Sequence, residues 1–122
     1  MSGAFMDRFD AKQQKKILAA GRQVHLPEGW APISEHTSAD KLYIIVSGEV
    51  SVRHHGKEVA RLGAGEVMGE KAIVSHTLRT ASLVALTELN LIHLTDDSVR
   101  ELSQSMPEFR TALEEVAASR TK

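Results

Sequence analysis

Two charged side chains of opposite sign stand close together in one short stretch of the sequence. Residues 69–82 read GEKAIVSHTLRTAS, in which Arg79 follows Glu70 by nine residues. An arginine guanidinium is permanently charged and can donate two parallel hydrogen bonds to a phosphate. The piece GEKAIV is rich in helix formers but short, so it predicts a single helical turn with free backbone N–H groups at its N-terminal end. The guanidinium and these N–H groups together are suited to bind a phosphate.

Other residues of this stretch extend the same chemistry. Gly69 has no β-carbon, so a ligand can approach the backbone closely. The carboxylate of Glu70 repels a lone phosphate, but it accepts hydrogen bonds from sugar hydroxyls and helps to orient Arg79. Thr80 and Ser82 add hydroxyl or backbone donors near the phosphate oxygens. Because a phosphate beside a ribose is part of a nucleotide, the stretch predicts a nucleotide site.

A simpler interpretation applies to the same residues. Glu70 and Arg79 form, on this view, an exposed ion pair that contributes little to stability. Gly69 is then only a tight-turn residue, and Thr80 and Ser82 only occupy strand positions. The complete pattern around the two charges favours ligand binding over this interpretation.

The composition limits what else the chain does. Its 122 residues suit one domain, and 15 basic against 16 acidic residues leave a formal charge of −1. We therefore expect no electrostatic attraction to nucleic acid or to an anionic membrane. The absence of cysteine excludes disulfides, thiolate metal sites and a cysteine nucleophile.

The sequence also predicts neither secretion nor a membrane span. Its longest apolar run, LYIIV at 42–46, is far shorter than the roughly eighteen residues of a membrane-spanning helix. The N-terminal MSGAFMDRFDAKQQKK has no apolar run followed by a small-residue cleavage site. We expect a cytoplasmic protein.

Six histidines raise the question of a metal site, above all the adjacent His54 and His55. Adjacent side chains on a strand point to opposite faces, and these two stand at a predicted hairpin tip. We therefore expect no metal site. The sequence also shows no placed acid and base pair, so we expect a protein that is not an enzyme.

Helix formers and glycines divide the chain into elements. Residues 7–20 predict an N-terminal helix that ends near Gly21. Short runs of valine, isoleucine and leucine broken by glycines follow from Val24 to Leu94 and predict many short strands. The sequence predicts a hairpin around HHGK and two strands around TEL within 79–95.

Two further helices are predicted after these strands. Thr95 or Asp96 is a candidate cap for the first, and Pro107 opens the second. The second helix has an apolar side that suits either packing on the barrel or a homodimer seam, and we favour packing. Trp30 and Tyr43 are interpreted as core or barrel-end residues. The apolar side consists of Phe109, Leu113 and Val116.

Residues 24 to about 116 resemble the cyclic nucleotide-binding domain of catabolite-activator-type regulators, cyclic-nucleotide-dependent kinases and gated channels. The family's phosphate-binding cassette, F-G-E-x-A-L-L, a loop and R-x-A-[ST]-V, appears here as MGEKAIV, the loop and RTASL. The upstream pattern, a glycine and then Y-x-I-x-x-G-x-V-x-V, appears as Gly29 and YIIVSGEVSV.

The resemblance implies a role for each cassette residue. Glu70 would bind the ribose 2′-hydroxyl and Arg79 the exocyclic phosphate oxygens, while the final helix, roughly 107–119, would cover the base. Backbone N–H groups of the cassette would line the phosphate. The implied ligand-binding set is Gly69, Glu70, Lys71, Ala72, Arg79, Thr80 and Ala81.

A few positions depart from the family pattern. Met68 replaces the usual aromatic residue and Leu83 replaces valine, and both substitutions keep an apolar packing role. His36 stands where the family often has a turn glycine. Thr80 occurs in members of the family that prefer cyclic GMP and in members that prefer cyclic AMP, so the preferred base stays open.

The residues and the resemblance together predict an α+β, mainly β fold. It is a barrel or jelly roll of about eight antiparallel strands with an N-terminal helix, a short phosphate-binding helix inside the barrel and two C-terminal helices. We expect one domain over 1–122, with a helical segment at 1–23, the barrel at 24–95 including the cassette at 68–83, and the C-terminal helices at 96–122.

The predicted function is that of a non-catalytic regulatory module without cofactors. Its ligand would be cAMP or cGMP, which closes the C-terminal helix over the pocket and signals to a separate protein effector. The alternative is a protein-interaction or dimerisation module on the same barrel that no longer senses nucleotide.

Overall fold

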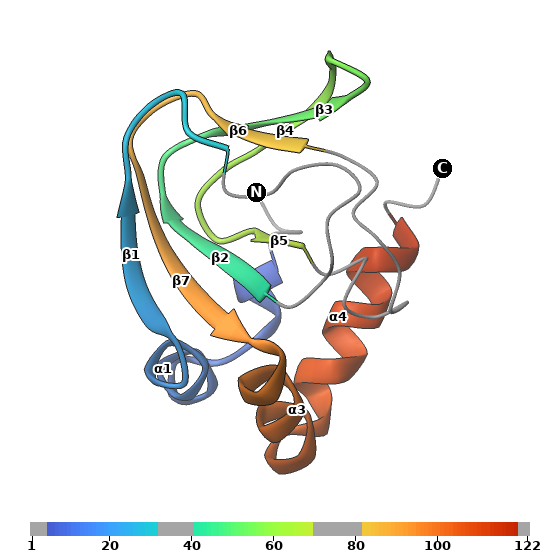
Figure 1. Ribbon diagram of the computed structural model, residues 1–122. Coiled ribbons are helices and arrows are strands. Elements are labelled where there is room, and N and C mark those ends of the chain that lie inside the picture. The colour runs from blue at the N-terminus through green and yellow to red at the C-terminus, as the bar shows by residue number, and fades with distance from the viewer. Residues whose placement is uncertain (1–4, 32–40, 70–81, 120–122) are drawn as a thin grey trace.

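A computed structural model of the chain describes residues 5–31, 41–69 and 82–119 (Figure 1). It confirms the predicted α+β fold, with an N-terminal helix, antiparallel sheets and two C-terminal helices. The elements in chain order are the 3₁₀-helix η1 (Phe5–Arg8), α1 (Ala11–Ala19), β1 (Arg22–Leu26), β2 (Lys41–Ser47), β3 (Val50–His54), β4 (Lys57–Leu62), β5 (Val67–Met68), β6 (Ser82–Ala85), β7 (Leu89–Thr95), α3 (Asp96–Ser105) and α4 (Pro107–Ser119).

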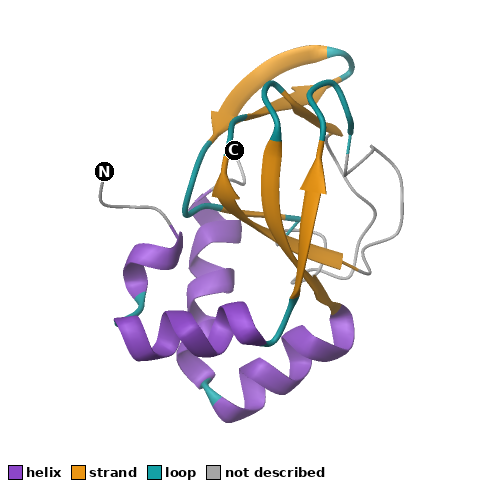
Figure 2. Ribbon diagram, turned by 90° about the vertical axis from the view of Figure 1, so that its left-hand side faces the viewer, coloured by secondary structure: helices purple, strands orange, loops and turns teal. Residues whose placement is uncertain are grey.

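The described strands form two antiparallel sheets. Sheet A has the order β1-β7-β2-β5, and sheet B has the order β4-β3-β6. The helices gather against one end of the strands (Figure 2). The predicted hairpin is β3–β4, and the two strands predicted within 79–95 are β6 and β7. The predicted phosphate-binding helix falls at 70–81, outside the described residues.

Sheet A separates two hydrophobic cores. The core between sheet A and sheet B is called the inner core, and the core between sheet A and the helices is called the helix-side core. On β7, Leu89 and Leu91 contribute to the inner core, whereas Ile92 and Leu94 contribute to the helix-side core. Both faces of this strand were predicted to be at least partly covered, and the burial of residues on each face confirms the prediction. The described residues of sheet A in the helix-side core are Leu42, Ile44, Val67, Ile92 and Leu94, and those in the inner core are Tyr43, Ile45, Met68, Leu89 and Leu91.

The N-terminal helix predicted over 7–20 is interrupted. η1 ends at Arg8, and α1 begins after Asp10, whose carboxylate accepts a hydrogen bond from the backbone N–H of Gln13 at 2.7 Å. The Gln13 side chain accepts in return from the Asp10 N–H at 3.1 Å. This reciprocal cap favours a helix start at Asp10 over a helix that passes through it.

The break allows Phe9 to join an aromatic cluster. The ring centroid of Phe5 lies 5.3 Å from that of Phe9 and 5.8 Å from that of Phe109 on α4. All three rings are buried. Edge-to-face contacts of this kind are favourable beyond the area they bury, so the cluster fixes the N-terminal segment against α4.

The C-terminal helices begin where the sequence predicted. Thr95 caps α3 by accepting from the Ser98 N–H at 3.1 Å, and Pro107 opens α4. Phe109 and Leu113 are fully buried in the helix-side core, and Val116 is 5% exposed. The apolar side of α4 therefore packs within the domain and is not an exposed dimer seam.

The burial of Trp30 and the orientation of the His54 and His55 rings refine two expectations from the sequence. Trp30 is 59% exposed, which excludes the core and leaves the predicted barrel-end position, whereas Tyr43 is buried as expected. The rings of His54 and His55 do not diverge, since their centroids are 4.1 Å apart. His55 is a turn residue with φ of 53°, followed by Gly56 with φ of 82°, so strand alternation ends before it.

Gly21 has a reason other than helix termination. α1 ends at Ala19, and a β-carbon added to Gly21 would lie 2.5 Å from Cγ2 of Ile92 and 2.8 Å from the carbonyl oxygen of His93. Only a glycine lets the end of the helix approach β7 this closely.

We predict that Gly21→Ala lowers the free energy of unfolding by about 1–3 kcal/mol, because the new methyl group overpacks against β7. Urea unfolding of the two proteins measures the difference. Gly63→Ala is the matched control, since a β-carbon there meets no atom within 4 Å, and its effect is expected to stay within about 0.5 kcal/mol. Equal stability of Gly21→Ala and the parent would contradict the prediction.

Candidate functional site

The predicted ligand-binding set is only partly described. Gly69 lies within the described residues, and the other predicted members lie outside them. Their roles therefore stay predictions from the sequence. The predicted residues outside the described ranges are Glu70, Lys71, Ala72, Arg79, Thr80 and Ala81.

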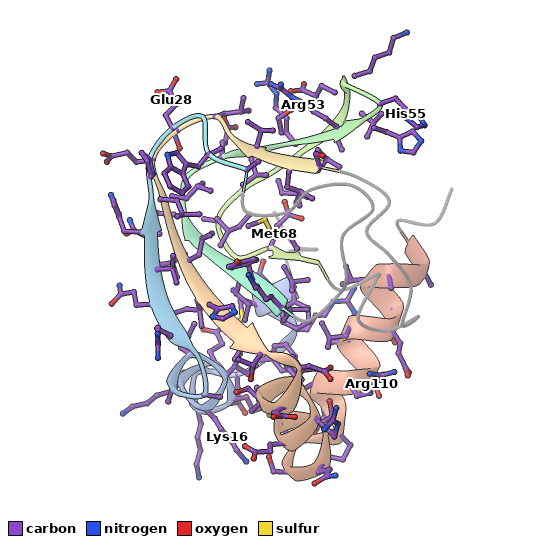
Figure 3. All side chains as sticks on the ribbon, in the orientation of Figure 1. Lys16, Glu28, Arg53, His55, Met68 and Arg110 are labelled. Atoms are coloured by element: carbon purple, nitrogen blue, oxygen red, sulfur yellow. The ribbon has the colours of Figure 1, made fainter. Side chains whose placement is uncertain are left out.

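Gly69 has a left-handed backbone conformation at the end of β5. It follows Met68, the last residue of β5, and has φ of 90°. Residues other than glycine adopt this region at a cost, so the backbone direction alone requires a glycine here. The side chain of Met68 is fully buried in the inner core, in the centre of the view in Figure 3. The apolar packing role predicted for Met68 is thereby confirmed.

The described strands on the two sides of residues 70–81 belong to different sheets. β5, which precedes it, pairs with β2 of sheet A through Tyr43 and Met68. β6, which follows it, pairs with β3 of sheet B through Leu83 and Val52. Leu83 is 7% exposed and belongs to the inner core, as its predicted packing role requires.

A row of side chains crosses sheet A at the level of Gly69. Paired residues of the four strands place Arg22, His93, Tyr43 and Met68 in register. Directly paired residues of antiparallel strands project from the same face, here the inner one. The rings of Tyr43 and His93 lie 5.4 Å apart between centroids, with an interplanar angle of 33°.

This row includes two polar residues, Arg22 and His93, whereas the neighbouring row of the inner face is apolar. The neighbouring row consists of Val24, Leu91 and Ile45, all of which pack in or against the inner core. His93 and Arg22 were not predicted from the sequence as site residues. Because His93 alternates with Ile92 and Leu94, and Arg22 lies two residues before Val24, the sequence can predict which face of the sheet each side chain is on. It cannot predict the register that aligns them with Met68, because that depends on how the strands pair.

The groove between α3 and α4 does not offer an obvious anion site. It has a volume of about 470 Å³ and is lined in part by Arg100 and Arg110. Arg100 pairs with Asp96 at 2.8 Å on its own helix, and Arg110 pairs with Glu114 at 3.0 Å. Both guanidiniums are thus already compensated within one turn of helix.

The described residues provide neither a metal-binding cluster nor a membrane-spanning helix. Over 5–31, 41–69 and 82–119, no three His, Asp or Glu side chains are arranged to hold a metal ion. Within the same ranges, each helix is too short or too polar to cross a membrane.

Comparison with known proteins identifies relatives over most of the chain. The family model described as cyclic nucleotide-binding domain matches residues 23–106. A cGMP-dependent protein kinase of Caenorhabditis briggsae is 41% identical over 87 residues, which are 71% of this chain and 12% of the kinase. A CRP-like cAMP-activated global transcriptional regulator of Mycobacterium tuberculosis is 29% identical over 122 residues, 93% of this chain and 54% of the regulator.

The fold is similar to that of solved structures as well. The crystal structure of Thermus thermophilus catabolite activator protein superposes with a TM-score of 0.86 at 24% identity, covering 97% of this chain and 58% of that protein. The chain spans about an eighth of the kinase and about half of the transcriptional regulator.

We predict that Gly69→Ala destabilises the protein by about 1–2 kcal/mol, the cost of a left-handed backbone for a residue with a β-carbon. Gly69→Asn is expected to cost less, because asparagine tolerates this conformation better. Chemical denaturation measures both. An asparagine variant as unstable as the alanine variant would show that the β-carbon, and not the backbone angle, is responsible.

Proposed function

The chain belongs to the cyclic nucleotide-binding domain family, and on that premise we propose that it is a non-catalytic regulatory module that binds cAMP or cGMP. The observation that carries the proposal is the family match over residues 23–106, which includes the complete pattern GEKAIV…RTAS. The left-handed Gly69 at the end of β5 supports it, since the backbone turns at the first residue of that pattern.

The proposed contacts follow the chemistry of the ligand. The Arg79 guanidinium and backbone N–H groups of the cassette neutralise the cyclic phosphate, and Glu70 accepts hydrogen bonds from the ribose. Gly69, Lys71, Ala72, Thr80 and Ala81 complete the set. Met68, which directly precedes this set, is buried in the inner core.

The expected affinity is moderate. A cyclic mononucleotide has about 22 non-hydrogen atoms, and about 0.3 kcal/mol per atom for a ligand approaching drug size gives about 7 kcal/mol. This free energy corresponds to dissociation constants of about ten micromolar. Such a ligand exchanges readily, as a reversible sensor requires.

The relatives support both nucleotides as candidates. The kinase is named as cGMP-dependent and the transcriptional regulator as cAMP-activated. Because the chain spans only part of each of these proteins, the output of the module is a separate proposal. We place it in a protein effector that recognises the position of the C-terminal helices.

Those helices are held to the rest of the domain from one side. α4 contacts η1 through the Phe5–Phe109 pair and through an ion pair between Arg8 and Glu115. Ligand closure over the base would add contacts to α4, so bound ligand would favour the closed position.

We predict that the protein binds cAMP, cGMP or both in calorimetric titration and that Arg79→Glu abolishes this binding. The reversed charge repels the phosphate and removes the two-pronged donor. Lys16→Glu on α1 is the control, because it makes the same change of charge at an exposed helical position. Binding by Arg79→Glu at the affinity of the parent would contradict the assigned role. Failure of the parent to bind either nucleotide would favour the alternative interaction module.

We also predict that saturating ligand slows amide hydrogen exchange in α3 and α4, over residues 96–119, by several-fold. Contacts with the ligand stabilise the closed position and make local opening rarer. Mass spectrometry of exchange with and without ligand measures the effect, and β3 serves as the internal reference. Unchanged exchange of the two helices in a protein that does bind nucleotide would contradict closure while leaving the binding site intact.

A further inference from the structure

Four side chains on the outer face of sheet B form a linked polar cluster outside the proposed nucleotide site. Ser51 on β3 donates a hydrogen bond to Oε1 of Glu58 on β4 at 2.7 Å. The Nε group of Arg53 donates to the Ser51 hydroxyl at 3.2 Å, and the Nε group of Arg61 donates to Oε2 of Glu58 at 3.0 Å. We refer to Ser51, Arg53, Glu58 and Arg61 as the β3–β4 cluster.

A β-bulge creates this cluster. Residues three apart in a regular strand lie on opposite faces, so Glu58 and Arg61 are not expected to meet. The pairing shifts from Val52↔Ala60 to Arg53↔Glu58, which leaves Val59 as the extra residue on β4. Glu58 is thereby turned to the outer face, where Arg61 already lies opposite Ser51. Bulges commonly re-aim side chains in this way and are found beside functional sites.

The cluster has a buried hydrogen-bonded serine at its centre, and its two arginines have donor groups that are not used within the described part of the chain. Ser51 has no exposed surface and is the buried polar residue among those described. Its hydrogen bond, followed by that from Arg61, lowers the pKa of Glu58, so the carboxylate stays charged and holds its donors at neutral pH. Within the described part of the chain, Arg53 and Arg61 donate only through Nε, so their Nη groups are available to an acceptor outside the domain.

The position of the cluster adds a second kind of binding capacity. In the described part of the chain β4 is the terminal strand of sheet B, so its outer edge presents backbone N–H and C=O groups. Val59, the bulge residue between Glu58 and Arg61, has a side chain that is 63% exposed. An extended peptide that pairs with such an edge gains backbone hydrogen bonds, and its side chains then meet those of the edge strand.

The β3–β4 hairpin and the C-terminal helices have opposite net charge. Residues 50–62 contain three basic residues and one acidic residue, with His54 and His55 at the tip. Residues 96–119 contain six acidic and two basic residues. The hairpin lies at the top of Figure 1 and α3 at the bottom, and Figure 3 labels Arg53 and His55 on the hairpin. The hairpin itself therefore has a net positive charge, which complements an acidic partner.

We propose that the edge of β4 with the β3–β4 cluster is a docking surface for an extended acidic segment of a partner protein. The segment adds as a strand beside β4. Its carboxylates accept hydrogen bonds from the Nη groups of Arg53 and Arg61, and an apolar side chain contacts Val59. This surface lies on the face of sheet B opposite the inner core, so the proposal does not depend on nucleotide binding.

A labelled peptide of alternating glutamate and valine tests the proposal on the full chain by fluorescence anisotropy. The parent protein is expected to bind it and to leave unbound a peptide in which lysine replaces every glutamate. Arg53→Gln/Arg61→Gln is expected to weaken binding by about tenfold or more, the loss of two charge-assisted contacts. Arg100→Gln/Arg110→Gln, which removes two arginines paired within their own helices, is expected to leave it unchanged.

Two further measurements separate this surface from its alternatives. A glutamate–valine peptide with alternate backbone nitrogens methylated keeps its charge but cannot pair as a strand, and it is expected not to bind the parent protein. This test needs no variant to fold. Equal binding of the methylated, lysine or parent peptides, absence of binding, or an unaffected Arg53→Gln/Arg61→Gln variant would overturn the proposal. Sedimentation that shows self-association lost in that variant would overturn it too, because the occupant would then be a second copy.

Discussion

The fold depends on β7, a central strand that is covered by apolar side chains on both faces. β7 lies between β1 and β2 in the middle of sheet A, with Leu91 packed in the inner core and Leu94 in the helix-side core. A shift of register by one residue would exchange these two faces, and every polar position of the strand with them. The same register places Ile92 and the carbonyl group of His93 against Gly21 and pairs His93 with Tyr43 of β2.

This arrangement explains how the candidate site and the C-terminal helices belong to one unit although they meet different faces of sheet A. Met68, beside Gly69, packs in the inner core, while its neighbour Val67 packs in the helix-side core with Phe109. Adjacent residues of β5 therefore touch both cores directly. A ligand that fixes the backbone after Met68 also constrains Val67, since interiors packed at this density do not deform locally without consequence.

The sequence predicted those features that depend on local chemistry. Thr95 as a cap, Pro107 as the start of α4 and the β3–β4 hairpin follow from neighbouring residues alone, and all are confirmed. The break at Asp10 was missed because helix propensity favours a continuous helix there, whereas the reciprocal cap with Gln13 competes successfully.

Features that depend on tertiary pairing were not available from the sequence. The exposure of Trp30, the alignment of His93 with Met68 and the bulge at Val59 all require knowledge of which residues face each other across strands. For the candidate site the outcome is divided. The positive φ of Gly69 fits a tight turn and a ligand site alike, and the contacts of Glu70 and Arg79 stay predictions because both residues lie outside the described ranges.

The alternation of β3 keeps the two proposed surfaces apart. Val50 and Val52 face the inner core beside Leu83, while Ser51 and Arg53 face outwards to Glu58. One strand thus contributes to the inner core and to the centre of the proposed docking surface, and the two sets of side chains are separated by its backbone. Replacing Arg53 by glutamine removes charge from the outer face without changing the volume of the inner core. A loss of peptide binding with normal nucleotide binding would therefore locate the two functions on opposite faces of the same sheet.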